Sequence, residues 1–267
     1  MGPLVTPDQL AAAQNVRILD ATWFLPEHGR DARAEHAAAH IPGTLFLDLP
    51  SLNGADGNLA DPAAFAARMG ALGVRESDAI VLYDNSPLHT SARAWWALRT
   101  MGARNIAILD GGLTAWTAAG HPTETGVSTP TPTVFTAKRD TAASRNLAQM
   151  RRATEQVVDA RGPGRFTGTE PEPRAGVASG HIPGAINLPY ARMFAADGTW
   201  KSPSDLAAAF ADAGVDIDRP IVTTCGSGVT AANLVFALDL LDRDAPLYDG
   251  SWTEWGSDPT TPKELGA

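Results

Sequence analysis

The residue in this chain best suited to nucleophilic chemistry is Cys225, the only cysteine among 267 residues. It follows the apolar, β-branched run Ile221–Thr224 and is itself followed by Gly226 and Gly228, after which an Ala/Leu-rich stretch begins. Glycines permit backbone conformations in which successive amides converge on one point ahead of a helix N-terminus. The pKa of a thiol falls in such a place. A lone cysteine is more often inert packing, but the glycines favour a thiolate nucleophile at a strand-to-helix turn.

The elements that must position this thiol belong to a chain that repeats itself. The sequence Ala-His-Ile-Pro-Gly-Thr at 39–44 returns as Gly-His-Ile-Pro-Gly-Ala at 180–185, and each copy follows an Asp-Ala pair, at 20–21 and 159–160. An Asp-Gly pair followed by Trp116 is echoed by a second pair followed by Trp255. Several landmarks kept in the same order predict a tandem duplication.

The repeat predicts two domains of similar length. We expect the first to span residues 1–122 and the second residues 141–267. Residues 123–140 carry prolines among threonines without a helical period, which is typical of a linker.

Within each half, short apolar runs alternate with helical stretches. In the first half the runs are Arg17–Leu19, Thr44–Leu47, Ala79–Tyr83 and Asn105–Leu109, followed by helices near residues 31, 62, 91 and 112. The second half repeats this order around Val157, Ala185, Ile221 and Leu247. The fold class is therefore α/β, with a mainly parallel sheet in each half and helices on both of its faces. Cys225 then lies at the carboxyl end of a strand, where open sheets of this type bind ligands.

Composition narrows the classes of partner and compartment. One cysteine permits no internal disulfide, so we expect a reducing, cytoplasmic location. The sequence has no cluster of cysteines and histidines with metal-ligand spacing, so we expect no cofactor. We expect neither a targeting segment nor a membrane span. The formal net charge of −9 argues against nucleic acid or an acidic membrane surface as a partner.

The counterpart of the cysteine segment in the first half is Ile80–Pro87, which has neither a thiol nor the Gly-x-Gly spacing. Only the second half can therefore supply the nucleophile. The first half either forms one wall of a cleft where the halves meet or is purely supporting.

Several motifs together resemble those of the rhodanese-type sulfurtransferases, most closely their mercaptopyruvate branch. They are Leu19–Trp23, Gly29–Arg33, the two His-Ile-Pro-Gly turns, Arg93–Trp96, Arg165–Phe166 with Glu170–Arg174, and the cysteine loop. The resemblance implies two rhodanese-like domains, of which only the second is catalytic. It also implies that Cys225 takes sulfur from a small-molecule donor, holds it as a persulfide, and passes it to cyanide or to a thiol such as thioredoxin or a small thiol.

The residues after the cysteine bear on the donor. Thiosulfate-specific members of the family carry basic side chains there, whereas Gly226-Ser227-Gly228 is neutral. The carboxylate of mercaptopyruvate is remote from the attacked sulfur, so arginines outside the loop should meet it. Arg165 and Arg174 fit that role, because guanidinium groups bind carboxylates in a fork. Without the resemblance, both would be read as surface salt bridges.

The remaining residues of the cysteine loop are also expected to take part. Ser227 either moves a proton to the leaving enolate or caps the next helix. The amides of Val229 and Thr230 extend the cup for the persulfide, together with Gly226 and Gly228.

The resemblance further implies that two residues of the first half are partners of that serine. They are Asp31, whose alternative role is to cap the following helix, and His40, whose alternative role is to anchor a Pro-Gly turn.

Two alternatives remain open: thiosulfate as the donor in place of mercaptopyruvate, and a non-catalytic sulfur carrier or docking module in place of an enzyme. A third alternative is excluded. A cysteine phosphatase would need an arginine at position 231, where this chain has alanine.

Overall fold

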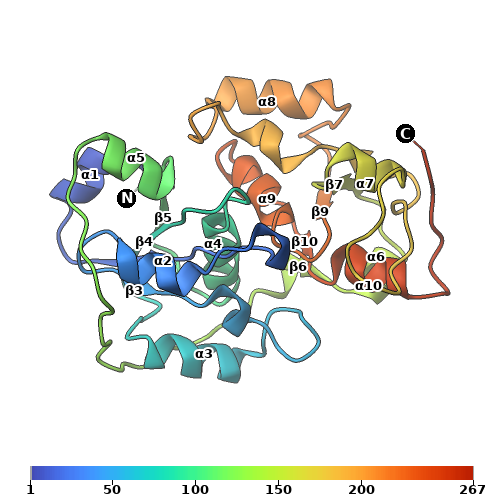
Figure 1. The fold of residues 1–267 in the computed structure, drawn as a ribbon. Coiled ribbons are helices and arrows are strands. Elements are labelled where there is room, and N and C mark those ends of the chain that lie inside the picture. The colour runs from blue at the N-terminus through green and yellow to red at the C-terminus, as the bar shows by residue number, and fades with distance from the viewer. Residues whose placement is uncertain (1, 267) are drawn as a thin grey trace. The chain divides into compact units, whose positions relative to one another are not determined.

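Each half of the chain builds a five-stranded sheet in which every paired strand is parallel to its neighbour, as the computed structural model shows for residues 2–266 (Figure 1). The strand order is β1-β5-β4-β2-β3 in the first sheet and β6-β10-β9-β7-β8 in the second. The two orders are the same once the numbering is shifted by five, so the duplication predicted from sequence is confirmed.

The strands of the first sheet are β1 (Leu4–Val5), β2 (Val16–Asp20), β3 (Leu45–Phe46), β4 (Ala79–Tyr83) and β5 (Ile106–Leu109). Those of the second are β6 (Ser144–Arg145), β7 (Gln156–Asp159), β8 (Ile186–Asn187), β9 (Ile221–Thr224) and β10 (Leu247–Tyr248). The central strands lie where the apolar runs predicted them. The two-residue edge strands β1 and β6 were not predicted, because so short a segment carries no alternation to detect.

The first five helices are α1 (Pro7–Ala12), α2 (Ala32–Ala38), α3 (Pro62–Ala71), α4 (Ser91–Thr100) and α5 (Gly112–Ala118). The others are α6 (Leu147–Met150), α7 (Pro163–Thr167), α8 (Pro203–Asp212), α9 (Ala231–Asp239) and α10 (Ser251–Ser257). Single 3₁₀ turns occur at Pro26–His28, Leu49–Leu52, Thr141–Ala143 and Tyr190–Met193.

Helix starts follow the chemistry of the sequence. Asp61 caps α3 and Ser202 caps α8, each accepting hydrogen bonds from backbone amides of the first turn. In both cases proline is the first helical residue, which is favourable because its missing N–H would have no partner there.

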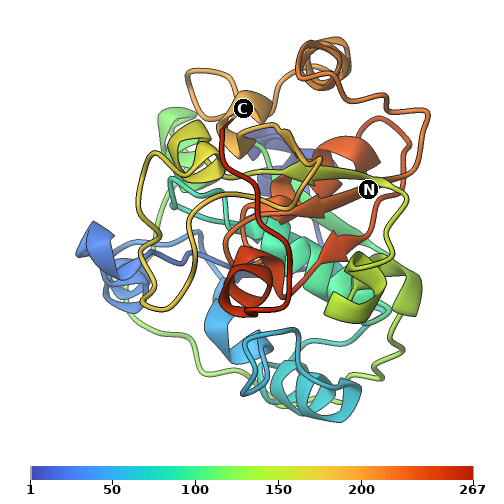
Figure 2. The same ribbon diagram turned by 90° about the vertical axis from the view of Figure 1, so that its right-hand side faces the viewer.

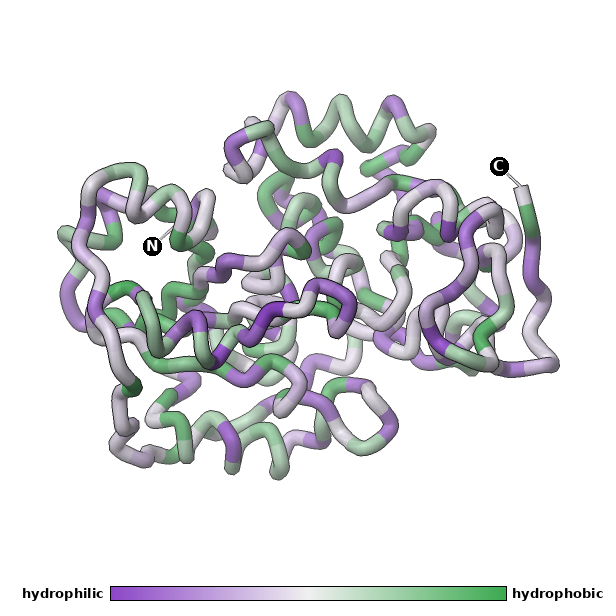
Figure 3. Tube along the Cα trace, viewed as in Figure 1, coloured by the Kyte–Doolittle hydropathy of each residue, from purple (hydrophilic) through white to green (hydrophobic). Residues whose placement is uncertain are grey.

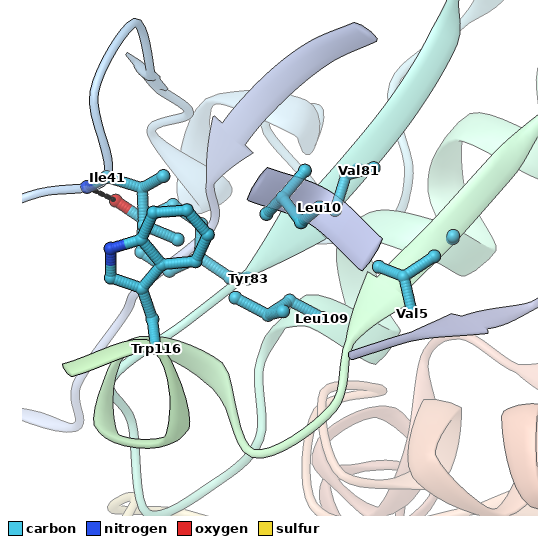
Figure 4. Packing of buried hydrophobic residues seen from close by; sticks show 8 residues of the cluster. Val5, Leu10, Ile41, Val81, Tyr83, Leu109 and Trp116 are labelled. Carbon is cyan, nitrogen blue, oxygen red and sulfur yellow. Dashed lines mark hydrogen bonds between the residues drawn. The ribbon is translucent and has the colours of Figure 1, made fainter. Parts of the chain in front are cut away.

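Helices cover both faces of the first sheet. On one face, Val81 and Tyr83 of β4 pack with Leu10 of α1 and Trp116 of α5 (Figure 4). Alternate strand residues point the other way, and Ile80 and Leu82 are fully buried on the opposite face, where α4 contacts β4 and β5. This arrangement confirms the predicted α/β class.

The second sheet has an equivalent core. Val222 of β9 and Tyr248 of β10 pack with Trp252 and Trp255 of α10, and both tryptophans are buried in the core. The C-terminal segment runs beside α10 (Figure 2), and Glu264 forms a backbone bridge with His181. Hydrophobic and hydrophilic residues alternate along α8 (Figure 3).

The chain packs as two compact units. The first unit extends to Asp140 and also takes in Ala196–Trp200, while the second contains the rest. The expected linker, 123–140, is held along the first unit by backbone hydrogen bonds, such as that from Thr133 N–H to the Gly70 carbonyl at 2.8 Å. Prolines exclude a helix there, but they do not prevent an extended chain from packing.

The segment 196–200 joins the first unit through the Trp200 amide, which donates to Asp110 Oδ1 at 2.8 Å. Within residues 2–266, no helix combines the length and apolar character needed to cross a membrane.

Candidate active site

Cys225 lies in the turn that joins the carboxyl end of β9 to α9. Its side chain is buried, and the amide of Gly228 donates to its Sγ at 3.1 Å. Gly228 has a φ of +77°, a conformation that a residue with a β-carbon rarely adopts. The glycine therefore allows the chain to fold back and direct an N–H group at the sulfur.

The start of α10 holds the cysteine loop from its other side. The amide of Trp252 donates to the Cys225 carbonyl at 2.9 Å, and the amide of Thr253 donates to the Gly226 carbonyl at 2.9 Å. The Thr253 hydroxyl donates to the same carbonyl at 2.6 Å. Two consecutive residues of the loop are thus fixed by two consecutive residues of the helix.

Ser251 completes this support, and sequence reasoning missed it. Its hydroxyl accepts the Cys225 amide at 3.3 Å and donates to the Tyr248 carbonyl at 2.8 Å. Ser251 has a φ of +50°, and its counterpart in the first half, Gly112, has a φ of +58°. The strain of a serine in the left-handed region is thus found beside the cysteine. The sequence signal that could have revealed Ser251 is that the second repeat has serine where the first repeat has glycine.

Arg165 lies directly over the loop. A β-carbon built on Gly226 would come within 2.9 Å of Arg165 Nη2, so the guanidinium fills the space that a side chain at 226 would need. Glu172 accepts hydrogen bonds from Nη2 at 2.5 Å and from Nε at 3.3 Å. The predicted arginine is therefore beside the cysteine loop.

Arg174 reaches the same loop through one intermediate. Its Nη1 donates to the Thr253 hydroxyl, which in turn donates to the Gly226 carbonyl. The structure therefore brings both predicted arginines to the backbone immediately after Cys225.

A buried ion-pair network lies behind Arg165, and the sequence did not reveal it. Arg161 pairs with Asp159, with an Nη2 to Oδ2 distance of 2.7 Å, and with Glu172, with an Nη1 to Oε1 distance of 2.8 Å. Burial lowers the pKa of Arg161, but the two carboxylates outweigh it, and the pKa is raised above its ordinary value. The signal was that Arg161 follows the repeated Asp-Ala pair, where the first half has Thr22.

The other predicted loop residues occupy the turn itself. Ser227, Val229 and Thr230 are partly buried between the strand and α9. Thr230, not Ser227, is the N-cap residue of α9, and its side chain makes no capping hydrogen bond. The alternative role of Ser227 as a helix cap is therefore wrong.

Asp31 and His40, the expected partners of the serine, lie in the first unit. Asp31 is the N-cap of α2, where its carboxylate accepts the amides of Arg33 and Ala34 at 3.0 and 3.1 Å. Its alternative structural role is therefore present in the fold.

His40 is buried, and both of its ring nitrogens have partners. Nδ1 lies 2.7 Å from the His36 carbonyl and Nε2 lies 3.2 Å from Glu124 Oε1. His181 repeats the pattern in the second unit, with Nδ1 2.9 Å from the Phe166 carbonyl and Nε2 3.8 Å from Glu264. These contacts are those of a residue that anchors a turn.

The position of Cys225 is taken by Asp84 in the first half, at the end of β4. The Asp84 carboxylate accepts the amides of Ser86 at 2.9 Å and Ser91 at 2.8 Å. This turn is therefore occupied by its own carboxylate and carries no thiol. Across residues 2–266, no group of three or more His, Cys, Asp or Glu side chains is arranged to hold a metal ion.

Comparison with known proteins places these observations in a family. The rhodanese-like domain family matches residues 6–119 and 143–258. Human 3-mercaptopyruvate sulfurtransferase is 41% identical over 255 residues, which cover 91% of this chain and 86% of that protein. Bovine thiosulfate sulfurtransferase is 37% identical over 252 residues, which cover 90% and 84%.

Among solved structures, SseA from Escherichia coli, described as a 3-mercaptopyruvate sulfotransferase with the rhodanese fold, superimposes with a TM-score of 0.86 at 35% identity. The match covers 94% of this chain and 99% of SseA.

Proposed function

The chain belongs to the rhodanese-like family, and from this membership we propose that it is a sulfurtransferase that moves sulfur from 3-mercaptopyruvate through Cys225 to a thiol or cyanide. The observation that carries the proposal is the arrangement around one neutral loop. A backbone amide points at the Cys225 sulfur, and two arginines reach Gly226 next to it.

In the first half-reaction, the Cys225 thiolate attacks the sulfur of the donor and forms a sulfur–sulfur bond. The carbon–sulfur bond breaks, its electron pair passes to carbon, and the enolate of pyruvate leaves while the cysteine becomes a persulfide. The Gly228 amide supports this step, because it donates to the sulfur atom that attacks the donor.

The arginines are proposed to bind the donor. The Arg165 guanidinium lies over Gly226, and Arg174 is linked to the same residue through Thr253. Two guanidinium groups can share the donor carboxylate and the neighbouring ketone oxygen, on which negative charge develops as the enolate forms.

Ser227 is proposed to move the proton that converts the enolate into pyruvate. Its hydroxyl stands two residues after the nucleophile, and it is not needed to cap α9. We assign no chemical step to Asp31 or His40, because the N-cap and turn contacts account for their positions.

In the second half-reaction, an acceptor thiolate attacks the outer sulfur of the persulfide and releases the Cys225 thiolate. Thioredoxin and small thiols are the acceptors we propose, in keeping with a reducing cytoplasmic location for a chain with one cysteine.

Thiosulfate is the second candidate donor, because bovine thiosulfate sulfurtransferase shares 37% identity with this chain. A dianion requires more compensating charge than a monocarboxylate, and the segment Gly226-Ser227-Gly228 supplies none. We therefore place mercaptopyruvate first.

The test compares the two donors at matched concentrations with a thiol acceptor present. We expect kcat/KM for mercaptopyruvate to exceed that for thiosulfate by at least about tenfold, a difference of about 1.4 kcal/mol in transition-state binding. Intact mass after donor exposure should show one added sulfur. The Cys225→Ser variant should give neither pyruvate nor the added mass while keeping its circular dichroism spectrum. Absence of turnover in the unaltered protein would favour a sulfur carrier or docking module.

A further inference from the structure

A single buried carboxylate joins two arginines behind the cysteine loop. Glu172 Oε1 accepts from Arg161 Nη1 at 2.8 Å, and its Oε2 accepts from Arg165 Nη2 at 2.5 Å. The Glu172 side chain is 4% exposed and that of Arg161 is 1% exposed, whereas Arg165 is 29% exposed. The chain thus runs from a buried cation, through a buried anion, to a cation at the surface of the loop.

We propose that Arg161 and Glu172 are positioning residues that fix the Arg165 guanidinium over Gly226, where it meets the carboxylate of the donor. The identity of that donor rests on the proposed function, but the placement of Arg165 does not.

Arg161 is held by contacts on several sides. Its guanidinium donates to Asp159 at the end of β7 and to the Gly180 carbonyl, at 2.7 and 2.8 Å from Nη2. It also lies 4.8 Å over the ring of Trp252, whose amide holds the Cys225 carbonyl. Arg161 is therefore tied to the strand before the site and to the helix behind the cysteine.

Glu172 links the position of Arg161 to that of Arg165. A carboxylate has two oxygens and can accept from two guanidinium groups at once. Because Arg161 fixes one oxygen, the other is fixed as well, and Arg165 binds it through Nη2 while Nε approaches Oε1 at 3.3 Å. A long, partly exposed side chain otherwise samples many rotamers, and ordering it at the moment of binding weakens affinity.

The first half of the chain has the same fold without this network. In the first half, Asp20 is the counterpart of Asp159, and it is satisfied by the Thr22 hydroxyl and by His36 Nδ1 at 2.8 Å. Thr22 stands in the position of Arg161. The half without a nucleophile thus keeps the aspartate and lacks the arginine, which links Arg161 to the site and not to the architecture.

Glu172→Gln is the discriminating variant. An amide keeps one acceptor oxygen in place of two, so the hydrogen bond from Arg161 Nη1 or that from Arg165 Nη2 is lost, and the NH₂ group opposes the guanidinium that it faces. The readout is the rate of alkylation of Cys225 by iodoacetate divided by the rate with iodoacetamide. Both reagents attack the same thiol, and only iodoacetate carries a carboxylate for Arg165 to bind.

We expect Glu172→Gln to lower this ratio about fivefold, because Arg165 is no longer held in place before the carboxylate arrives. If the charge of Glu172 acted only through space, its removal would favour the anionic reagent and raise the ratio. A raised ratio or an unchanged ratio would overturn the proposal. Glu170→Gln is the matched control, because it removes the same charge from the same loop at an exposed position, and it should leave the ratio unchanged.

A double-variant cycle identifies the route. In an Arg165→Ala background, Glu172→Gln should no longer alter the ratio, since its effect passes through Arg165. A persistent effect there would contradict the proposal. If Glu172→Gln does not fold, as judged by near-ultraviolet circular dichroism, Glu172→Asp replaces it, because it keeps the charge but shortens the reach, and it should lower the ratio too.

The same variants separate this inference from the proposed function. For mercaptopyruvate, Glu172→Gln should raise KM about fivefold with kcat nearly unchanged. A lowered alkylation ratio in a protein that does not use mercaptopyruvate would support the positioning network and reject the donor. Normal use of mercaptopyruvate with an unchanged ratio would support the donor and reject the network.

Discussion

Gly226 is important because it has no side chain. A β-carbon at this residue would lie 2.9 Å from Arg165 Nη2 and 3.4 Å from Nη1, so the guanidinium occupies the space above the backbone. The φ of Gly226 lies outside the left-handed region, and an alanine would fit the backbone itself. At this residue, glycine provides room for a neighbour and not conformational freedom.

A methyl group at this position should therefore act through Arg165. We expect Gly226→Ala to lower kcat/KM for mercaptopyruvate about tenfold with little loss of stability, because the flexible end of Arg165 moves aside. Gly162→Ala is the control, since a β-carbon there meets nothing within 4 Å. Steady-state kinetics and urea denaturation of both variants check this, and full activity of Gly226→Ala would contradict it.

Arg174 offers a second test at the same scale. Its removal should weaken the use of a carboxylate donor, because one of two guanidinium groups is lost. We expect Arg174→Ala to lower kcat/KM for mercaptopyruvate at least about tenfold and that for thiosulfate much less. Equal losses with both donors would argue against a carboxylate-binding role.

At the scale of elements, the cysteine loop is held between two secondary structures. Cys225 directly follows β9 at the carboxyl edge of the sheet, and amides of the first turn of α10 donate to the carbonyls of Cys225 and Gly226. The amides of a first helical turn have no partners within their own helix, and here they are used to fix the nucleophile. The geometry of the site is thus a property of how α10 packs and not of the loop alone.

At the start of α2, two substitutions of Asp31 distinguish its role as a helix cap from a role in the reaction. Asparagine caps a helix as well as aspartate does but carries no charge. We expect Asp31→Asn to keep both stability and sulfur transfer, and Asp31→Ala to lose about 1 kcal/mol of stability. Urea denaturation and steady-state rates check both variants. Loss of turnover in a stable Asp31→Asn protein would show that the charge takes part in the reaction.

At the scale of the whole molecule, one architecture has been used twice with different chemistry at the same turn. Asp84 in one unit and Cys225 in the other both follow a central strand and accept backbone amides. In both units, therefore, the turn after the central strand provides backbone amides that can bind an anionic group. Whether that turn is reactive depends on the residue that stands there.

Exposed carboxylates on both units make stability depend on pH. Backbone hydrogen bonds from Ala64 and from Thr136 lower the pKa of Asp61 and of Glu76, and the Thr260 hydroxyl does the same for Asp258. A folded pKa below the ordinary value means that the stabilisation is present above about pH 4 and is lost as pH falls through the folded value.

Urea denaturation should show this as a falling free energy of unfolding between about pH 5 and pH 3. Asp61→Asn should reduce the slope, because asparagine keeps the cap of α3 without titrating. Burial raises the pKa of Asp110 and works in the opposite direction, so Asp110→Asn should steepen the slope. An unchanged slope in Asp61→Asn would contradict the account.

The sequence by itself determined the features that short stretches of chain encode. The apolar run before Cys225, the glycines after it and the paired His-Ile-Pro-Gly turns predicted the nucleophile turn, the duplication and the central strands, because the period of a strand and the conformations of glycine are local properties. Arg165 and Arg174 were found through the resemblance of their motif and not from spacing alone.

Only the tertiary structure decided which distant groups meet. Ser251 reaches the Cys225 amide across 26 residues, and Glu172 bridges Arg161 and Arg165 from a loop with no helical or strand period. Residues 123–140 look like a linker in sequence yet pack along the first unit through backbone groups that every residue carries. Such contacts depend on where the sheet and helices place their ends, and no local pattern of side chains records that.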